Sequence, residues 1–506
     1  MKKYLIATLC ITTILAAESN LQQKTAKSVI QIWMWGGPSQ NDTFDPKPAA
    51  GYDYCGPLDK AIPTNIPGIE INASLPMLAK IADKYSIIRS MTHGINAHES
   101  AAYYVQTGHK PGIGLVYPSL GAIVTAFKIK EYKGKIPPYI VLTQSQGRFS
   151  EEGFLGPLYK PFVTGGDPNQ KVFAVEGIIA EGISEQQQIR RRQLLKKLDT
   201  LGRLMPDYPD FIFFDQAESE AYEMILGETK KIFDLSLEPN EIRDRYGRNT
   251  FGQSCLVARR LVEAGAVYIT INYSGWDTHK QHFQAMQRKL AEFDQGLSAL
   301  LEDLEKRGLL ESTIVWCCGE FGRTPKIDWE PPWNGGRGHW GHCFSALVAG
   351  GGFKGGMVVG ASDEKGAYVV QRPVYPEDLL RSILRLLGID PDGCLPNDKG
   401  IDIKVMPIVR EPDGLAMSSR NKYLSPEERK KAIILYKSLM MAKELIHSGE
   451  RDCSNIIYNM QSFILSNVPD AKIDYISIVD PSTLNDLHKI DKTCVIALAV
   501  FIGTTR

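Results

Sequence analysis

The sequence predicts an α/β protein, with one large domain built on a layered sheet and a small α+β lobe after it. Across residues 28–390, short apolar segments alternate with amphipathic helical patterns. This order is typical of a sheet with helices on both faces. The turn-rich stretch DPDGCLPNDKG at 390–400 interrupts the alternation and indicates a domain boundary. We therefore expect domains at 28–400 and 401–506.

The first residues have the features of a secretory signal. Lys2 and Lys3 precede an apolar run at 4–17, which is too short to cross a bilayer. We predict a signal peptide at 1–19 and an exported or periplasmic protein. The alternative is a buried N-terminal strand or helix. Because the sequence has no other long apolar run, we expect no integral membrane segment after signal cleavage.

The large domain contains six segments that we expect to be buried strands. They lie at 28–35, 85–91, 139–143, 266–273, 312–318 and 344–352. Their nearly continuous apolar character is typical of parallel strands covered on both faces. Helical patterns lie at 75–85, 252–265, 282–308 and 376–390. Gly265 and Gly308 are expected to end two of these helices, because glycine tolerates the backbone conformation found after a helix terminus.

The lobe is predicted to contain strands and helices. Strands are expected at 401–409, 472–480 and 494–503, and helices at 430–449 and 453–467. In both helices apolar residues recur at spacings of three and four, so one face of each can pack on a sheet.

Composition excludes several classes of protein. The chain has 58 Lys and Arg against 58 Asp and Glu, which gives no reason to expect nucleic acid as a partner. Its 9 cysteines include the adjacent Cys317 and Cys318 but no CxxC pair. They predict neither a disulfide framework nor a zinc knuckle. A small-molecule substrate is the expected partner.

Acidic and histidine side chains lie at the ends of four predicted strands. They are Asp42 and Asp45 after 28–35, Asp277, His279 and His282 after 266–273, Glu320 with Arg323 after 312–318, and Arg337, His339 and His342 before 344–352. Open α/β folds bind ligands at the carboxyl ends of strands. Carboxylate with imidazole suits a zinc- or manganese-type hydrolytic centre, so we predict a divalent metal site. The alternative is a set of hydrogen-bonded structural histidines.

Ser100 is the candidate nucleophile. It follows the strand at 85–91 and is flanked by His98 and Glu99. A hydroxyl beside a divalent cation can be deprotonated for attack. Arg323 is a candidate for bidentate binding of an anionic group, with a surface salt bridge as the alternative.

Six longer motifs together resemble a known family. They are GGPSQNDTFDPKP, FLGPLYKPFVTGGDP, RDRYGRNTFGQSCLVARRLVEAG, WDTHKQHF, GEFGRTPKI and HCFSALVAGGGFKGG. Over about residues 28–400 the chain resembles the bacterial family called domain of unknown function 1501. That family is placed in the alkaline phosphatase and sulfatase superfamily. The resemblance implies an alkaline-phosphatase-like sheet and metal-dependent hydrolysis of a phosphate or sulfate ester.

The resemblance also implies roles for single residues. Those that match the superfamily's metal ligands are Asp277, His279, Glu320 and His339, and Asp42 is a further candidate ligand. HESAAYYVQTGHK resembles the nucleophile segment of alkaline phosphatases, with Ser100 in the place of the serine. The family commonly has Asp before the histidine of GRDHW, where this chain has Gly338. One carboxylate of a two-metal site is therefore missing.

A second site is predicted in the lobe, in the stretch VREPDGLAMSSRN. Asp413-Gly414 makes a turn. Ser418, Ser419 and Arg420 then offer two hydroxyls and a guanidinium, which are donors suited to phosphate oxygens. The alternative is a polar, capped loop without a ligand.

The lobe closely resembles the C-terminal lobe of pantothenate synthetase, the pantoate–β-alanine ligase family. The similarity includes GERD, KIDYISIVDPSTL and AVFIGTTR. It implies ATP with Mg²⁺ as a ligand, with Ser418, Ser419 and Arg420 on its phosphates and Val409 on the adenine side. The family's nucleotide-binding N-terminal domain has no counterpart upstream in this sequence, so too few contacts would position the reactants. We expect no ligase activity from this chain alone.

Three functional hypotheses follow. The first is an exported hydrolase that carries a truncated ligase lobe. The second is a cytoplasmic ligase fragment of pantothenate biosynthesis, and the third is a non-enzymatic binding protein on a degenerate phosphatase fold. The predicted signal opposes the second, because ATP and pantoate are cytosolic, whereas Gly338 favours the third. A gene fusion, or an artefactual joining of two reading frames near residue 400, accounts for the two parts of the chain.

Overall fold

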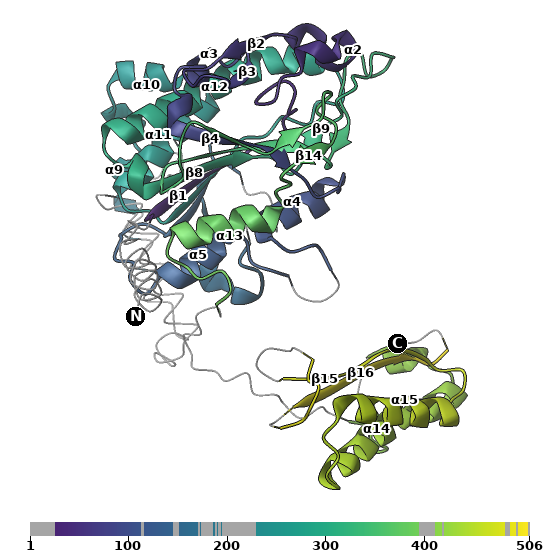
Figure 1. Ribbon diagram of the computed structural model, residues 1–506. Helices are drawn as coiled ribbons and strands as arrows, with labels where there is room; N and C mark the ends of the chain where they lie inside the picture. The colour runs from purple at the N-terminus through teal and green to yellow at the C-terminus, as the bar shows by residue number, and fades with distance from the viewer. Residues whose placement is uncertain are drawn as a thin grey trace, which may run out of the picture. The chain divides into compact units, whose positions relative to one another are not determined.

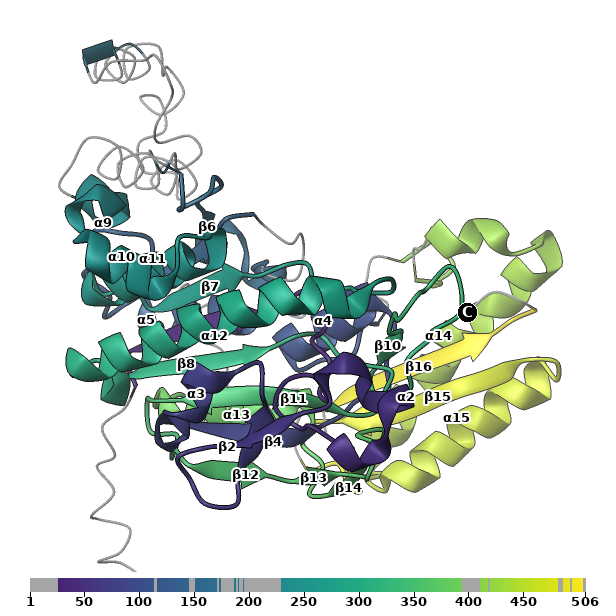
Figure 2. The same ribbon diagram turned by 90° about the horizontal axis from the view of Figure 1, so that it is seen from above.

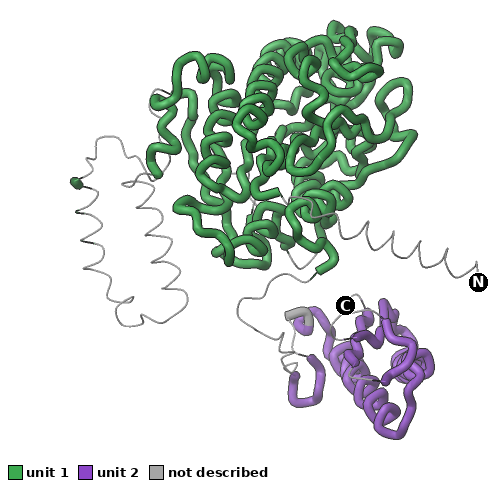
Figure 3. The backbone as a smooth tube through the Cα atoms, turned by 60° about the vertical axis from the view of Figure 1, so that its left-hand side comes forward, with its two compact units in different colours: residues 1–396 green, residues 397–506 purple. Residues whose placement is uncertain are grey.

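The computed structural model describes most of the chain. The described residues are 26–112, 116–144, 151–170, 173, 186–187, 190, 194, 229–393, 410–416, 419–480, 486–491 and 494–503. The chain divides into two compact units, residues 1–396 and 397–506 (Figure 3). The predicted signal peptide and the predicted strand at 401–409 lie outside the described residues.

An eight-stranded sheet forms the middle of the first unit (Figures 1 and 2). Its strand order is β12-β4-β11-β8-β1-β7-β5-β6. The strands are β1 (Ser28–Trp33), β4 (Tyr85–Met91), β5 (Tyr139–Leu142), β6 (Phe162–Val163), β7 (Tyr268–Asn272), β8 (Thr313–Cys318), β11 (Phe344–Ala349) and β12 (Met357–Val359). β1 runs parallel to both of its neighbours, with Ile32 opposite Ile271 of β7 and Cys317 of β8. The predicted α/β fold is confirmed.

One strand departs from the predicted parallel arrangement. β11 runs antiparallel to both β4 and β8. All six of its residues are buried, so its hydrophobicity is that of a fully covered strand and does not reveal its direction. The reversal brings the start of β11 to the edge where the neighbouring parallel strands end.

Helices cover both faces of the sheet, as the sequence predicts (Figures 1 and 2). The principal helices are α4 (His98–Thr107), α5 (Leu120–Lys128), α11 (Thr250–Glu263), α12 (His282–Lys306) and α13 (Pro376–Leu386). α11 and α12 share a core with Ile30 and Ile32 of β1. α4, α5 and α13 share a second core with Val29 and Trp33 of the same strand. β1 contributes to both cores because successive side chains of a strand point to opposite faces.

The two long helices end where the sequence indicates. Gly265 and Gly308, which follow α11 and α12, have φ values of 89° and 68°. Glycine adopts this left-handed conformation without steric cost. At the other end of α11, Asn249 accepts a hydrogen bond from the N–H of Gly252 at 2.8 Å, a typical N-cap.

The single helix predicted at 75–85 is instead two short turns. They are α3 (Pro76–Ala79) and η3 (Ala82–Lys84). Asp294 of α12 accepts the N–H groups of Met77 and Leu78, both at 2.8 Å, so a distant helix satisfies the first turn. Tertiary contacts therefore override the local helical pattern.

Smaller elements complete the first unit. They are α2 (Tyr52–Cys55), β2 (Ala61–Pro63), β3 (Glu70–Asn72), α9 (Lys230–Phe233), α10 (Asn240–Tyr246), β9 (Gly322–Arg323), β10 (His339–Trp340), β13 (Ala361–Ser362) and β14 (Val369–Gln371). Across the described ranges of the chain, no helix has both the length and the apolar character needed to cross a membrane.

The second unit is the small lobe. Its elements are η9 (Ser419–Tyr423), α14 (Pro426–His447), α15 (Cys453–Asn467), β15 (Lys472–Val479) and β16 (Val495–Phe501). Ser425 and Glu428 form a capping box at the start of α14. β15 and β16 pair antiparallel, and the helices pack on them through a core that includes Ile456 and Met460. The predicted pair of helices and the two C-terminal strands are present.

Leu297 of α12 offers a test of the larger core. It is fully buried, so Leu297→Ala removes apolar contacts and leaves a cavity. We expect the free energy of unfolding of this unit to fall by about 2–5 kcal/mol, measured by urea denaturation. Leu237→Ala, at a side chain that is 56% exposed, should change it by less than about 0.5 kcal/mol. Equal effects of the two substitutions would contradict the described core.

Candidate functional site

Four residues lie together at the edge of the sheet where β1, β7 and β8 end. Three of them, Asp277, Glu320 and His339, are predicted metal ligands, and the fourth is His98. Asp277 follows β7 and Glu320 follows β8. His339 belongs to β10, which pairs with β9 just beyond Glu320. His98 is the first residue of α4, the helix that follows β4. His339 reaches this edge because β11, which it precedes, runs antiparallel to its neighbours.

Ligand atoms of His98, Asp277 and His339 all lie within 4.8 Å of one another. His98 Nε2 is 3.3 Å from Asp277 Oδ2, and His339 Nε2 is 3.2 Å from Asp277 Oδ1. His279 Nε2 is 2.8 Å from His339 Nε2 and 3.2 Å from Asp277 Oδ1. Two ligands of a tetrahedral zinc ion, with bonds of about 2.0–2.1 Å, lie roughly 3.3 Å apart. The arrangement is therefore of a size that a cation can fill.

Hydrogen bonds on the far side of two imidazoles aim their other nitrogens at Asp277. His98 Nδ1–H donates to Glu320 Oε1 at 2.6 Å, and His339 Nδ1–H donates to the carbonyl oxygen of Asn96 at 2.8 Å. With Nδ1 as the donor, loss of the proton from Nε2 leaves a neutral ring whose Nε2 lone pair can bind a cation. Carboxylate and carbonyl oxygens orient metal-binding histidines in this way.

Burial and neighbouring charges shift the pKa values of His98, Asp277 and His279. Hydrogen bonds with Asp277 and Glu320 raise the pKa of His98 to about 9. Burial alone raises the pKa of Asp277, but hydrogen bonds from two imidazoles and Arg323 outweigh burial and hold that pKa well below its usual range. Burial lowers the pKa of His279, which favours its neutral form. A proton and a divalent cation compete for such nitrogens.

The sequence predicts that Glu320 is a metal ligand. In the structure it hydrogen-bonds to His98 instead. The residue is fully buried. Its Oε1 and Oε2 lie 3.0 and 3.2 Å from the backbone nitrogen of Gly36, and Oε1 also accepts from His98. Because both oxygens already accept hydrogen bonds within the protein, Glu320 orients the imidazole from behind.

Arg323 forms its ion pair with Asp277 from a buried position, and its predicted role in binding an anionic group stays a prediction. The residue is fully buried. Nε donates to the carbonyl of Gly37 and Nη1 to that of Arg337, both at 3.1 Å. Nη2 donates to the carbonyl of Gly36 and to Asp277. Each nitrogen is thus engaged, and the side chain fixes Asp277.

The glycine pair after β1 allows these close approaches. Gly36 and Gly37 have φ values of 108° and 75°. A Cβ at Gly36 would collide with the backbone of Asp277, and a Cβ at Gly37 would lie 2.5 Å from the carbonyl oxygen of Phe321. The GG of GGPSQND is therefore needed where the loops after β1, β7 and β8 meet.

Asp42 lies in a separate buried cluster and not among the candidate ligands. Its carboxylate is 2.9 Å from Arg337 Nε and 2.8 Å from His282 Nε2, and all three side chains are at most 1% exposed. Burial raises the pKa of Asp42, but the charge of Arg337 and the hydrogen bond from His282 outweigh burial and lower that pKa. The pairing compensates the buried charge, so Asp42 stabilises the loop that carries Arg337.

Ser100 lies in the first turn of α4 and is half-buried. Residues two apart on a helix do not share a face. Ser100 therefore does not project from the side of α4 that carries His98. Its role as nucleophile stays a prediction.

Gly338, which stands where the family commonly has Asp, donates its backbone N–H to Thr324 Oγ1 at 2.9 Å.

The predicted ATP contacts are not described as side chains. Val409 and Ser418 lie outside the described residues, and only the backbone of Ser419 and Arg420 is described, in η9. Their predicted role stays a prediction.

His98 is the candidate ligand that the sequence did not identify as one. It stood in the sequence only as a neighbour of Ser100. Its position at the start of the helix that follows β4 was a usable signal, because the ends of neighbouring strands converge at one edge of a sheet.

Two family models match the chain. Residues 26–410 match the family described as "Protein of unknown function (DUF1501)", and residues 397–506 match "Pantoate-beta-alanine ligase". The pantothenate synthetase of Thermosipho africanus (strain TCF52B) is 49% identical over 140 residues, which are 28% of this chain and 46% of that protein. The pantothenate synthetase of Thermoanaerobacter sp. (strain X514) is 53% identical over 106 residues, 21% of this chain and 37% of that protein. The chain thus spans less than half the length of these relatives.

Solved structures similar to the chain include two with low sequence identity. The lipoteichoic acid synthase LtaP from Listeria monocytogenes is 8% identical, with a TM-score of 0.34, over 72% of this chain and 73% of that one. A protein in the alkaline phosphatase superfamily from Vibrio parahaemolyticus is 10% identical, with a TM-score of 0.35, over 72% of this chain and 67% of that one.

The buried pair of Arg337 and Asp42 gives a test of the loop that carries His339. Arg337→Met leaves Asp42 buried with its main charge partner removed. We expect the free energy of unfolding to fall by about 3–5 kcal/mol, measured by urea denaturation. Arg288→Met is the matched control, because Arg288 is 81% exposed in its ion pair and should cost less than about 1 kcal/mol. A small effect of Arg337→Met would show that the pair is not buried.

Proposed function

Residues 26–410 belong to the DUF1501 family, and from that premise we propose that the large domain is a metal-dependent hydrolase of phosphate or sulfate esters. The observation that carries the proposal is the convergence of His98, Asp277 and His339, whose ligand atoms lie within 4.8 Å of one another. Two of the three side chains are half-buried and the third is exposed, so a substrate can reach them.

The donor set fits a zinc- or manganese-type cation. Imidazole suits zinc and carboxylate suits harder cations such as manganese. His98, Asp277 and His339 would hold the ion, with His279 beside them. Glu320 and the carbonyl of Asn96 would keep two of the imidazoles oriented.

Residues of the chain itself would position the ligands and limit access of water. When bound, such a cation supplies Lewis-acid polarisation of an ester oxygen. Arg323 holds Asp277 in place through its buried guanidinium. His279, whose Nε2 lies 2.8 Å from His339 Nε2 and 3.2 Å from Asp277 Oδ1, borders the proposed cation. Phe321 stacks on His339 with ring centroids 4.6 Å apart and limits access of water from that side. Ser100 stays a proposed nucleophile on the resemblance alone, because it does not share a face of α4 with His98.

The alternative for this domain is a non-enzymatic binding protein. Gly338, which stands where the family commonly has Asp, favours that alternative. Metal content and ester turnover, measured on the same preparation, separate the two.

Metal binding is the first test. The full chain should bind about one equivalent of Zn²⁺ or Mn²⁺ and cleave an aryl phosphate or aryl sulfate. His98→Ala and His339→Ala should each abolish both properties, because each removes one of three ligands. Inductively coupled plasma mass spectrometry and a chromogenic assay measure the two outcomes.

The controls separate ligands from supports. Glu320→Gln should weaken metal affinity by about 10–100-fold without abolishing it. His109→Ala, at an exposed histidine outside the group, should change neither property. Metal binding without turnover in the parent would favour the binding protein, and absence of metal from the parent would end the proposal.

We also propose that the lobe keeps a nucleotide-binding loop without ligase activity. The match of residues 397–506 to the pantoate–β-alanine ligase model supports the loop. The membership of residues 26–410 in another family opposes ligation by this chain, since the reactants need a second domain to position them. The predicted signal at 1–19 implies export of the hydrolase, whereas ligation would require a cytoplasmic protein.

ATP binding tests this second proposal. The full chain should bind Mg-ATP weakly, and Arg420→Ala should weaken binding by at least about tenfold, because a charge-assisted contact with phosphate is lost. Isothermal titration calorimetry measures both. Lys472→Ala, at an exposed residue of β15, is the control. Failure of the parent chain to bind ATP would refute nucleotide binding by the loop. Formation of pantothenate would refute the proposed absence of ligase activity.

A further inference from the structure

We propose that a cavity beside the candidate metal centre binds the uncharged, polyhydroxylated body of the substrate, as in an ester of a neutral oligosaccharide. The inference rests on the proposed function for the ester group. Binding of the sugar body can be measured by itself.

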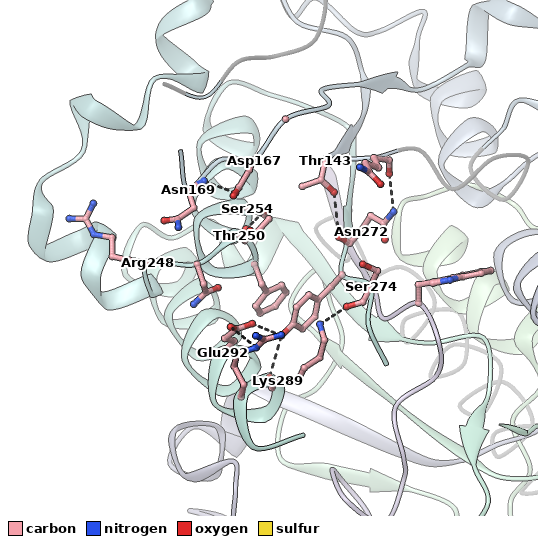
Figure 4. Close-up of a pocket in the computed structure, with 17 residues that line it drawn as sticks. Thr143, Asp167, Asn169, Arg248, Thr250, Ser254, Asn272, Ser274, Lys289 and Glu292 are labelled. Carbon is pink, nitrogen blue, oxygen red and sulfur yellow. Dashed lines mark hydrogen bonds and ion pairs between the residues drawn. The ribbon is translucent and has the colours of Figure 1, made fainter. Parts of the chain in front are cut away.

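The cavity lies at the carboxyl ends of two strands of the sheet. Thr143 directly follows β5, and Asn272 is the last residue of β7 (Figure 4). Lys289 and Glu292 of α12 form the opposite side (Figure 4). The volume is about 930 Å³, near the upper end of the range of small-molecule sites. It is far larger than a phosphate or sulfate group requires, so the cavity suits the body of a substrate.

Trp35 joins the cavity to the candidate metal centre. It lines the cavity, and its ring stacks on that of His98 with centroids 5.3 Å apart. Ser274 also lines the cavity and precedes Asp277 by three residues in the same loop. A ligand that lies against Trp35 is therefore adjacent to the proposed site of ester cleavage.

The charged side chains of the cavity are already engaged by the protein. They are Asp167, which accepts from the N–H of Asn169, Arg248, which pairs with Asp244, Arg288 and Glu292, which pair with each other, and Lys289, which donates to the carbonyl of Ser274. Lys289 Nζ also lies 3.8 Å from the centre of the Tyr273 ring. Three basic and two acidic side chains leave this wall with little net charge, so it is poorly suited to a strongly charged ligand.

Neutral amides and hydroxyls form much of the remaining wall. They belong to Gln144, Asn169, Thr250 and Asn272, and to Asn249 and Ser254, which also hydrogen-bond within α11. Amides and hydroxyls both donate and accept, which matches the hydroxyl groups of a sugar. Trp35 is half-buried, whereas the other two aromatic residues of the wall, Phe251 and Tyr273, are buried. The indole therefore offers an aromatic surface for the apolar face of a sugar ring.

The backbone of Thr143 is a further sign of a binding site. Its φ is 69°, a left-handed conformation that is unfavourable for a β-branched residue. The N–H of Thr143 donates to Thr164 Oγ1 at 3.0 Å, which holds the turn. Strain of this kind is concentrated at ligand sites.

Glycan binding is the test. The full chain, treated with EDTA, is applied to an array of immobilised neutral and anionic oligosaccharides. We expect retention of neutral oligosaccharides. Asn272→Ala and the nearly isosteric Thr250→Val should each weaken retention by at least about tenfold, because each removes hydrogen-bonding atoms from the wall. Circular dichroism verifies that both variants fold.

The control is Gln284→Ala, an exposed amide on α12 outside the cavity wall, which should leave retention unchanged. Retention of anionic glycans alone, no retention, or retention that neither variant reduces would overturn the inference. Hydrolysis of aryl esters is measured in parallel without EDTA. Glycan retention without hydrolysis removes only the proposed function, and hydrolysis without glycan retention removes only this inference.

Discussion

The buried guanidinium of Arg323 is the interaction on which the candidate centre depends. It donates to the carbonyl oxygens of Gly36, Gly37 and Arg337 and to the carboxylate of Asp277. Burying a cation costs several kcal/mol unless hydrogen bonds and an opposite charge compensate it. Here the compensation comes from the loops after β1 and β7 and from the segment before β10. Only a planar group with five donors can join so many segments at once, so a lysine could not replace this arginine.

A second buried arginine, Arg337, holds the other end of the segment that connects β9 and β10. Arg323 lies in β9, and Arg337 lies two residues before His339 of β10. Arg337 donates to the carbonyl oxygens of Thr324, Pro325 and Tyr54 and pairs with Asp42. The position of His339 therefore depends on charges that never reach solvent. This dependence explains why Asp42, which follows the first strand like a ligand, is instead part of the support.

The two units of the chain carry separate chemical possibilities. The first has a converging set of imidazoles and a carboxylate beside a polar cavity, and the second matches one part of a ligase family. A fold does not by itself imply a function, because function depends on the groups at a site. In the first unit those groups come from three segments at one sheet edge, the start of α4, the loop after β7 and β10, whereas residues 397–506 match a ligase family model and the chain spans less than half the length of the relatives named above. The hydrolase proposal therefore rests on geometry, and the nucleotide proposal rests on similarity.

The sequence by itself determined most of the helices and strands and the strand ends at which candidate site residues lie. Apolar runs such as 312–318 and the glycine stops at Gly265 and Gly308 are local signals, so strands and helices could be predicted from them, and Asp277, His279 and His339 stood visibly at strand ends. Only the tertiary structure decided how these residues meet. It set the direction of β11, gave His98 the position beside Asp277 that was expected of Glu320, and buried Arg323. The physical reason is that each of these outcomes depends on contacts between distant segments. The hydrogen bond between His98 and Glu320, for example, spans 222 residues, and no local pattern of side chains encodes it.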